Sequence, residues 1–93
     1  MDKEQAMRVL AETLATYRVK SYAVIKELVG QTEYCEVAVP GDVVLQIEIS
    51  VIRDDKADGD IRVMGAIDDG GWRTFIPLCD DFIMAPDGSF ADE

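Results

Sequence analysis

The stretch Val43-Val44-Leu45-Gln46-Ile47-Glu48-Ile49-Ser50-Val51-Ile52-Arg53 decides the fold of this chain. Its apolar residues recur at every second position, so that one face collects Val43, Leu45, Ile47, Ile49 and Val51. The opposite face carries Gln46, Glu48 and Ser50. Because successive side chains of a strand point to opposite faces, this pattern predicts a long β-strand with one face in the core.

Alternating runs flank this stretch on both sides. Residues 32–39 precede it, and Pro40-Gly41-Asp42 supplies turn-forming residues between the two runs. A polar loop over 53–60 leads to a third alternating run over 61–67. The sequence therefore predicts three consecutive strands joined by turns, which is the pattern of an antiparallel meander.

The apolar positions also predict how the strands pair. Placing Val51 opposite Val63 brings Ile47 opposite Ile67, and all of these residues then share one face. Gly65 lies at the centre of that face, where its missing side chain leaves room for close packing of a helix.

A fourth strand is predicted over Trp72 to Leu78. If Asp69-Gly70 forms a two-residue turn, Ile67 lies opposite Trp72 and Ile61 opposite Leu78. Residues 32–78 then form a four-stranded meander in which the apolar residues of these cross-strand pairs all lie on one face.

The first 30 residues have a helical period instead. Asp2 and Gln5 have the spacing of a capping box, and an apolar stripe follows at Met7, Leu10, Ala11, Leu14 and Tyr17. Ser21 is suited to cap a second helix, which Gly30 would end in a left-handed conformation. One bent helix and two helices both fit this pattern.

These segments together predict a single α+β domain in a chain of 93 residues. The helical segment (1–30) covers the apolar face of the meander (32–78). Residues 79–93 form a tail in which Pro86-Asp87-Gly88 is a turn signal. This tail either closes a small hairpin or lies over a sheet edge.

Composition excludes several classes of function. The chain has 9 basic and 19 acidic residues and no histidine, for a net charge of −10. Repulsion disfavours nucleic acid and anionic membranes as partners, and histidine-based triads are excluded. Without a signal sequence or an apolar span we expect a cytoplasmic protein, in which Cys35 and Cys79 are buried reduced thiols.

The candidate chemical motifs are incomplete. Asp54, Asp58 and Gly59 match positions of a calcium loop, but Lys56 replaces a ligand and Gly65 replaces the bidentate glutamate. No serine or cysteine has a sequence neighbour that would activate it as a nucleophile. We therefore expect neither a metal nor another cofactor, and no enzymatic activity.

One segment resembles a known group of proteins. Residues 68–78, Asp-Asp-Gly-Gly-Trp-Arg-Thr-Phe-Ile-Pro-Leu, and residues 86–90, Pro-Asp-Gly-Ser-Phe, are similar to the end of a family of small uncharacterised bacterial proteins. The resemblance covers the C-terminal half and implies a bacterial origin and a helix-then-meander order. It implies no activity.

The outer face of the predicted sheet carries an unusual apolar centre. The predicted register places Met64 opposite Phe75, and Ala66 opposite Arg73. Adding the pair Ile52 and Arg62 gives an interaction patch of Met64, Phe75, Ile52, Arg73 and Arg62. Tyr34 is nearby, and Glu36 and Glu48 belong to the charged rim. Either another chain or the tail from Phe82 to Phe90 covers this patch.

We expect a non-enzymatic protein-interaction module that binds a protein partner or a second copy of itself. An acidic immunity-like or antitoxin-like partner of a basic protein is a specific form of this hypothesis. The alternative is a small-molecule-binding domain with a cavity between helix and sheet, lined by Trp72, Tyr17 and Tyr22.

Overall fold

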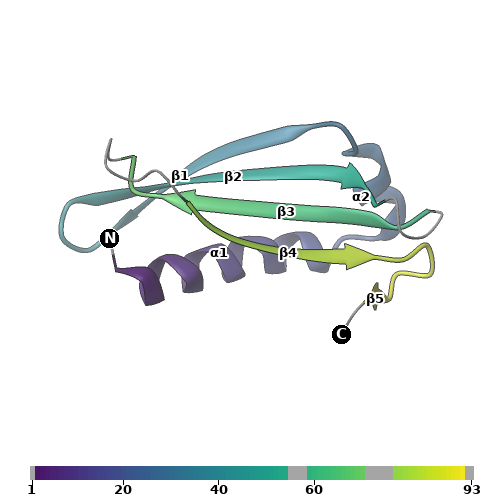
Figure 1. Cartoon of the computed structure of the whole chain (residues 1–93), viewed down its shortest axis with the longest axis horizontal. Helices are drawn as coiled ribbons and strands as arrows, with labels where there is room; N and C mark the ends of the chain where they lie inside the picture. Colours follow the sequence, from purple (N-terminus) through teal and green to yellow (C-terminus); the bar gives the residue numbers. More distant parts are fainter. Residues whose placement is uncertain (1, 55–58, 71–76, 92–93) are drawn as a thin grey trace.

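Two helices lie against one face of a five-stranded antiparallel sheet in the computed structural model (Figure 1), which describes residues 2–54, 59–70 and 77–91. The strand order is β1-β2-β3-β4-β5. The elements are α1 (Lys3–Arg18), α2 (Tyr22–Glu27), β1 (Thr32–Val39), β2 (Val43–Arg53), β3 (Ile61–Asp68), β4 (Leu78–Met84) and β5 (Phe90–Ala91). The α+β class is confirmed, with β1 to β4 as the meander.

The helical segment consists of two helices, each with its own N-terminal cap. The Asp2 carboxylate accepts a hydrogen bond from the backbone N–H of Gln5 at 3.1 Å, and the Ser21 hydroxyl accepts one from Val24 N–H at 3.3 Å. Both caps satisfy amide groups that have no partner within the helix. No helix in the described ranges is long and apolar enough to cross a lipid bilayer.

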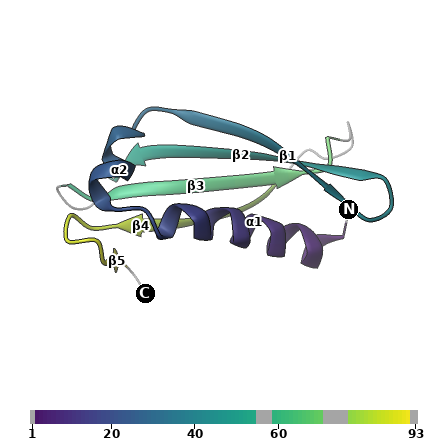
Figure 2. The same cartoon turned by 180° about the vertical axis from the view of Figure 1, so that it is seen from behind.

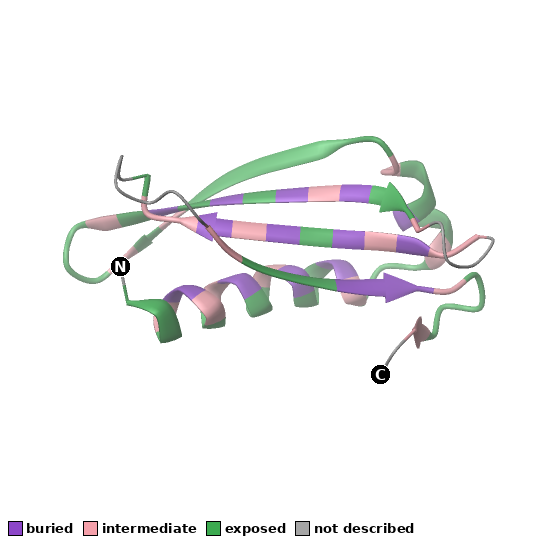
Figure 3. Ribbon diagram, in the orientation of Figure 1, coloured by how far each residue is buried: buried purple, intermediate pink, exposed green. Residues whose placement is uncertain are grey.

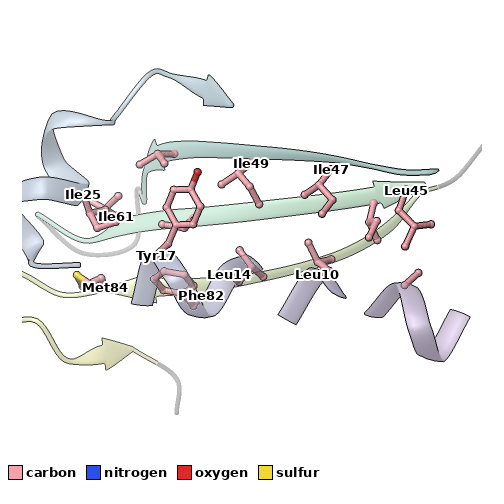
Figure 4. Close-up of a cluster of buried hydrophobic side chains, with 14 residues drawn as sticks. Leu10, Leu14, Tyr17, Ile25, Leu45, Ile47, Ile49, Ile61, Phe82 and Met84 are labelled. Atoms are coloured by element: carbon pink, nitrogen blue, oxygen red, sulfur yellow. The ribbon is translucent and has the colours of Figure 1, made fainter. Parts of the chain in front are cut away.

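The core lies between α1 and the sheet. α1 packs against β3 and β4, and the side chains of Leu10 and Leu14 point toward β2 and β3 (Figure 4). A Cβ added to Gly65 would lie 2.7 Å from Leu10 Cδ1 and 3.1 Å from Ile49 Cδ1. The missing side chain of Gly65 thus permits the close contact between helix and sheet that the sequence predicts.

α1 leaves most of β1 uncovered, although Tyr17 near the end of α1 forms a hydrogen bond with Glu33 of β1. Figures 1 and 2 show α1 beneath β3 and β4, whereas β1 is on the far side of β2. Most of β1 is therefore exposed on both faces (Figure 3), and only Val37 and Val39 are partly buried. The sheet is wider than its helical layer.

The predicted register of the second and third strands is confirmed. Val51 pairs with Val63, and Ile47 pairs with Ile67. β1 spans the predicted residues 32–39 and pairs with β2 across the turn at residues 40–42. Leu45, Ile47, Ile49 and Val51 are all buried on the helix-facing side, here called the inner face.

The predicted position of the fourth strand is wrong. Ile67, rather than Ile61, pairs with Leu78, so β4 continues to Met84 and Ile61 pairs with that residue. This register buries Phe82 and Met84 in the core, and it starts the strand just after Pro77, which has no amide hydrogen to donate. The predicted strand residues Trp72 to Ile76 lie outside the described residues.

The tail forms the small hairpin that was one of the two predicted alternatives. Ala85 N–H donates to Ser89 O at 2.8 Å, and β5 pairs with the end of β4. The rings of Phe82 and Phe90 meet edge to face, with centroids 5.6 Å apart. The guanidinium of Arg18 lies 4.7 Å and 4.8 Å from these two centroids, so cation–π contacts join the end of α1 to the hairpin.

Candidate functional site

The outer face of the sheet, which points away from α1, carries the candidate site. Alternation and strand register arrange its side chains in rows that cross the strands. One row contains Tyr34, Glu48, Ala66 and Cys79. The rows on either side contain Thr32, Ser50, Met64 and Asp81, and Glu36, Gln46 and Asp68.

Two adjacent hollows lie on this face. The first has a volume of about 310 Å³, and Tyr34, Glu36 and Asp68 are among its lining residues. The second has a volume of about 390 Å³ and is lined in part by Met64 and Asp81. Glu48 and Ala66 line both hollows, so the Glu48 carboxylate lies at the boundary between them.

Carboxylates dominate the charge of the outer face. Four of them come from different strands: Glu36, Glu48, Asp68 and Asp81. Arg62, the basic residue that the described part of β3 places on this face, forms ion pairs with Asp81 and with Asp54, the latter at 3.8 Å. Since Arg62 already has acidic partners, the Glu48 region keeps an excess of negative charge.

The predicted interaction patch is only partly assembled. Ile52 pairs with Arg62, as predicted. Met64 pairs with Asp81 instead of Phe75, and Ala66 pairs with Cys79 instead of Arg73, because β4 has a different position. Phe75 and Arg73 lie outside the described residues.

The hairpin at the end of the chain does not cover this patch. Met64 is 39% exposed and Ile52 is 41% exposed. Residues 78–91 extend the edge of the sheet, with Phe82 in the core beneath it. Met64 and Ile52 therefore remain open to solvent.

Two of the three aromatic residues proposed for a helix–sheet cavity, Tyr17 and Tyr22, have other roles in the structure. Tyr17 belongs to the core and is 7% exposed. Burial, followed by the hydrogen bond and negative charge of Glu33, raises the pKa of Tyr17 to about 12. The Tyr22 hydroxyl donates a hydrogen bond to the Gly59 carbonyl at 2.5 Å. Trp72 lies outside the described residues.

The expectation that the two cysteines are buried is wrong. Cys35 and Cys79 are both free and exposed. Cys35 is on the inner face, opposite Ile47, but α1 packs mainly against β3 and β4 and leaves this cysteine exposed. Cys79 is on the outer face beside Ala66.

The acidic side chains do not form a metal centre in the described part of the chain. No three His, Cys, Asp or Glu side chains converge there to hold a metal ion. The acidic loop considered above includes residues 55–58, which lie outside the described ranges.

The alternation of the sequence predicts Glu36, Glu48 and Met64 on the outer face, but Asp68 and Asp81 are not among the predicted residues. A fourth strand that ends at Leu78 leaves Asp81 in the tail, which is where the sequence pattern predicts it. The apolar pair Phe82 and Met84 has the spacing of a strand, and it is the signal that would have placed Asp81 correctly.

The charge of the chain is divided unevenly between its two halves. The helical segment, residues 1–30, has five basic and four acidic residues. Residues 31–93 have four basic and 15 acidic residues. The negative charge of the protein therefore belongs to the part of the chain that forms the sheet and its loops.

Comparisons with known proteins add no assignment to this geometry. No protein-family model, no curated protein and no solved structure matches the chain.

Proposed function

We propose that this protein is a non-enzymatic interaction module that binds a basic protein through the outer face of its sheet. The observation that carries the proposal is the separation of charge, since the helical segment is nearly neutral and the sheet segment is strongly acidic. The negative field of the sheet segment attracts a cationic partner to that part of the molecule and raises its association rate.

The chemistry of the two hollows supports a partner rich in lysine or arginine. Glu48 offers a carboxylate between them, and Met64, Ala66 and Tyr34 add apolar surface beside it. A long basic side chain lays its aliphatic part on apolar surface and extends its charged end to a carboxylate. The exposed ring of Tyr34 provides a further face for a guanidinium group.

An immunity-like or antitoxin-like protein that neutralises a basic toxin is the specific form of this proposal. We place it in the cytoplasm, where free exposed thiols such as Cys35 and Cys79 stay reduced. The alternative of a ligand cavity between helix and sheet draws no support from the packing of Leu10, Leu14 and Ile49 around Gly65.

A charge-matched pair of variants tests the binding face. An oligo-arginine peptide is titrated into the wild type, into Glu48→Gln on the outer face, and into Glu12→Gln on the exposed side of α1. Both variants remove one negative charge. We expect Glu48→Gln to weaken binding about fivefold, which corresponds to about 1 kcal/mol, and Glu12→Gln to have little effect. Equal weakening by both variants would mean that the peptide senses only total charge.

The same pair of variants tests the protein partner. The product of a neighbouring gene that encodes a small basic protein is the first candidate. We expect it to bind the wild type and Glu12→Gln, and to bind Glu48→Gln more weakly. A partner that binds all three proteins equally would place the interface elsewhere.

A further inference from the structure

The outer edge of β1 has a defined set of free backbone groups. Gly30 N–H donates to Val51 O at 2.8 Å, and Val51 N–H donates to Gln31 O at 3.2 Å. With Gly30 at φ +88°, this pattern is a β-bulge that fixes the phase of the ladder between β1 and β2. From this bulge onward, hydrogen-bonded and non-hydrogen-bonded residue pairs alternate along β1 and β2. The backbone groups that point away from β2 therefore belong to Thr32, Tyr34, Glu36 and Ala38.

This edge has few of the features that prevent pairing with another strand. β1 is eight residues long and contains neither proline nor lysine, and β2 is its paired neighbour in the described sheet. The opposite edge is different, because β5 covers the end of β4 and two successive acidic residues, Asp80 and Asp81, precede that part. Long uncovered edges with free backbone groups favour the addition of a strand.

We infer that β1 pairs antiparallel with β1 of a second copy, which joins two sheets into one across a twofold axis. The outward-pointing residues of one β1 strand must pair with the outward-pointing residues of the other. The twofold axis therefore passes beside Tyr34, Cys35 or Glu36, and the residue at the axis lies opposite its own copy. Centring on Tyr34 aligns only residues 32–36 of the strand, whereas the other two centres align seven residues. Centring on Glu36 places two carboxylates directly opposite each other, which is unfavourable. Cys35 is therefore the centre.

The side chains fit this register. Tyr34 lies opposite Glu36 of the second copy, and Thr32 lies opposite Ala38, so no like charges face each other on the outer face. On the inner face Glu33 lies opposite Val37. On the inner face the exposed Cys35 and the partly buried Val37 would gain neighbours from the second copy in the space beside α1 that the monomer leaves open.

This dimer goes beyond the proposed function and does not depend on it. A twofold axis perpendicular to the sheet keeps both outer faces on the same side, so the pairing leaves Glu48 and the second hollow exposed. The first hollow, which Tyr34 and Glu36 help to line, lies beside the seam and stays on that same side. Failure of the dimer would leave binding of a basic partner intact, and failure of that binding would leave the dimer intact.

The two exposed cysteines provide a direct test. Cys35 and its copy form a non-hydrogen-bonded pair, in which Cα atoms are about 4.5 Å apart, within the range of about 4.4–6.8 Å that a disulfide spans. Cys79→Ser leaves Cys35 as the single thiol, and Cys35→Ser leaves Cys79, which is also exposed. With diamide as the oxidant, we expect Cys79→Ser to form a covalent dimer at least tenfold faster than Cys35→Ser. Similar rates would indicate random collision and overturn the inference.

A backbone variant separates edge pairing from other contacts. Glu36→Pro removes an outward N–H without removing a bond to β2, and Glu36→Thr changes the same side chain but keeps that N–H. In sedimentation at high micromolar concentration we expect the wild type and Glu36→Thr to have twice the 10.3 kDa mass of the chain. Glu36→Pro should be a folded monomer with slow Cys35 crosslinking. A monomeric wild type, or a dimeric Glu36→Pro, would overturn the inference.

Discussion

Replacement of Gly65 by alanine tests how tightly α1 and the sheet are packed. The added Cβ would lie 2.7 Å from Leu10 Cδ1, 3.1 Å from Ile49 Cδ1 and 3.4 Å from Leu14 Cδ2. These side chains are themselves buried, so they have little space into which to move. Overpacking of this kind costs about 1–3 kcal/mol, and the reduced freedom of the unfolded chain returns about 0.4–1 kcal/mol. We expect a net loss of about 1–2 kcal/mol.

A second substitution shows whether the close contact is the cause. Leu10→Ala removes the nearest atom and alone should cost about 2–5 kcal/mol by leaving a cavity. In the double variant, the methyl group that Gly65→Ala adds occupies part of that space. We expect the double variant to lose about 1–2 kcal/mol less in free energy of unfolding than the two single variants lose together.

Urea denaturation of the four proteins measures this coupling. The free energies of unfolding are comparable if the dependence on urea concentration is the same for all four. In thermal unfolding, each 1 kcal/mol corresponds to about 4–8 °C for a domain of this size. Additive effects, or a Gly65→Ala variant as stable as the wild type, would refute the close packing described for this position.

Three further predictions concern other parts of the core and the outer face. Because the pKa of Tyr17 is raised from 10.0 to about 12, the contribution of its protonated hydroxyl to the free energy of unfolding should be constant below pH 10 and lost between pH 10 and 12. Thermal unfolding over this pH range should show a loss of roughly 2–3 kcal/mol in the wild type that the Tyr17→Phe variant lacks. Ile47→Ala should cost about 2–5 kcal/mol in urea denaturation because that side chain is buried between sheet and helix, and a loss below 1 kcal/mol would contradict this placement. Arg62 lies opposite Ile83, which is 6% exposed on the outer face, so the aliphatic part of the arginine covers that side chain. Arg62→Met keeps this cover and should lower the free energy of unfolding by less than about 1 kcal/mol, whereas Arg62→Ala should lower it by more; equal losses would assign the effect to the ion pairs.

The local features of the fold were predictable from the sequence. Caps at Asp2 and Ser21 and the pairing of Val51 with Val63 depend on side chains within a few residues or on one repeated period. The position of β4 was not predictable in this way, because residues 72–78 and residues 78–84 both offer alternating apolar positions. The Asp69-Gly70 turn signal favoured the first register, and burial of Phe82 and Met84 in the core favours the second.

The candidate site was predictable where it depended on β2 and β3 alone. Alternation placed Glu48 and Met64 on the outer face without knowledge of their neighbours. The exposure of Cys35 depends instead on the lateral position of α1, which packs mainly against β3 and β4 and leaves most of β1 uncovered. An apolar stripe on a helix indicates that it packs against a sheet, but it does not indicate which strands it covers.

The packing of α1 against β3 and β4 also determines when the protein can fold during synthesis. α1 is made before the strands that cover its apolar stripe, and β4 follows it by about 60 residues of chain. Until β4 is available, Leu10 and Leu14 have only part of their native surroundings. Contacts so distant in sequence are slow to form, and the exposed stripe meanwhile is a binding site for chaperones. We expect ribosome-bound chains that end at Pro77 to be cleaved by protease within α1, and chains extended beyond β5 by a linker to be protected.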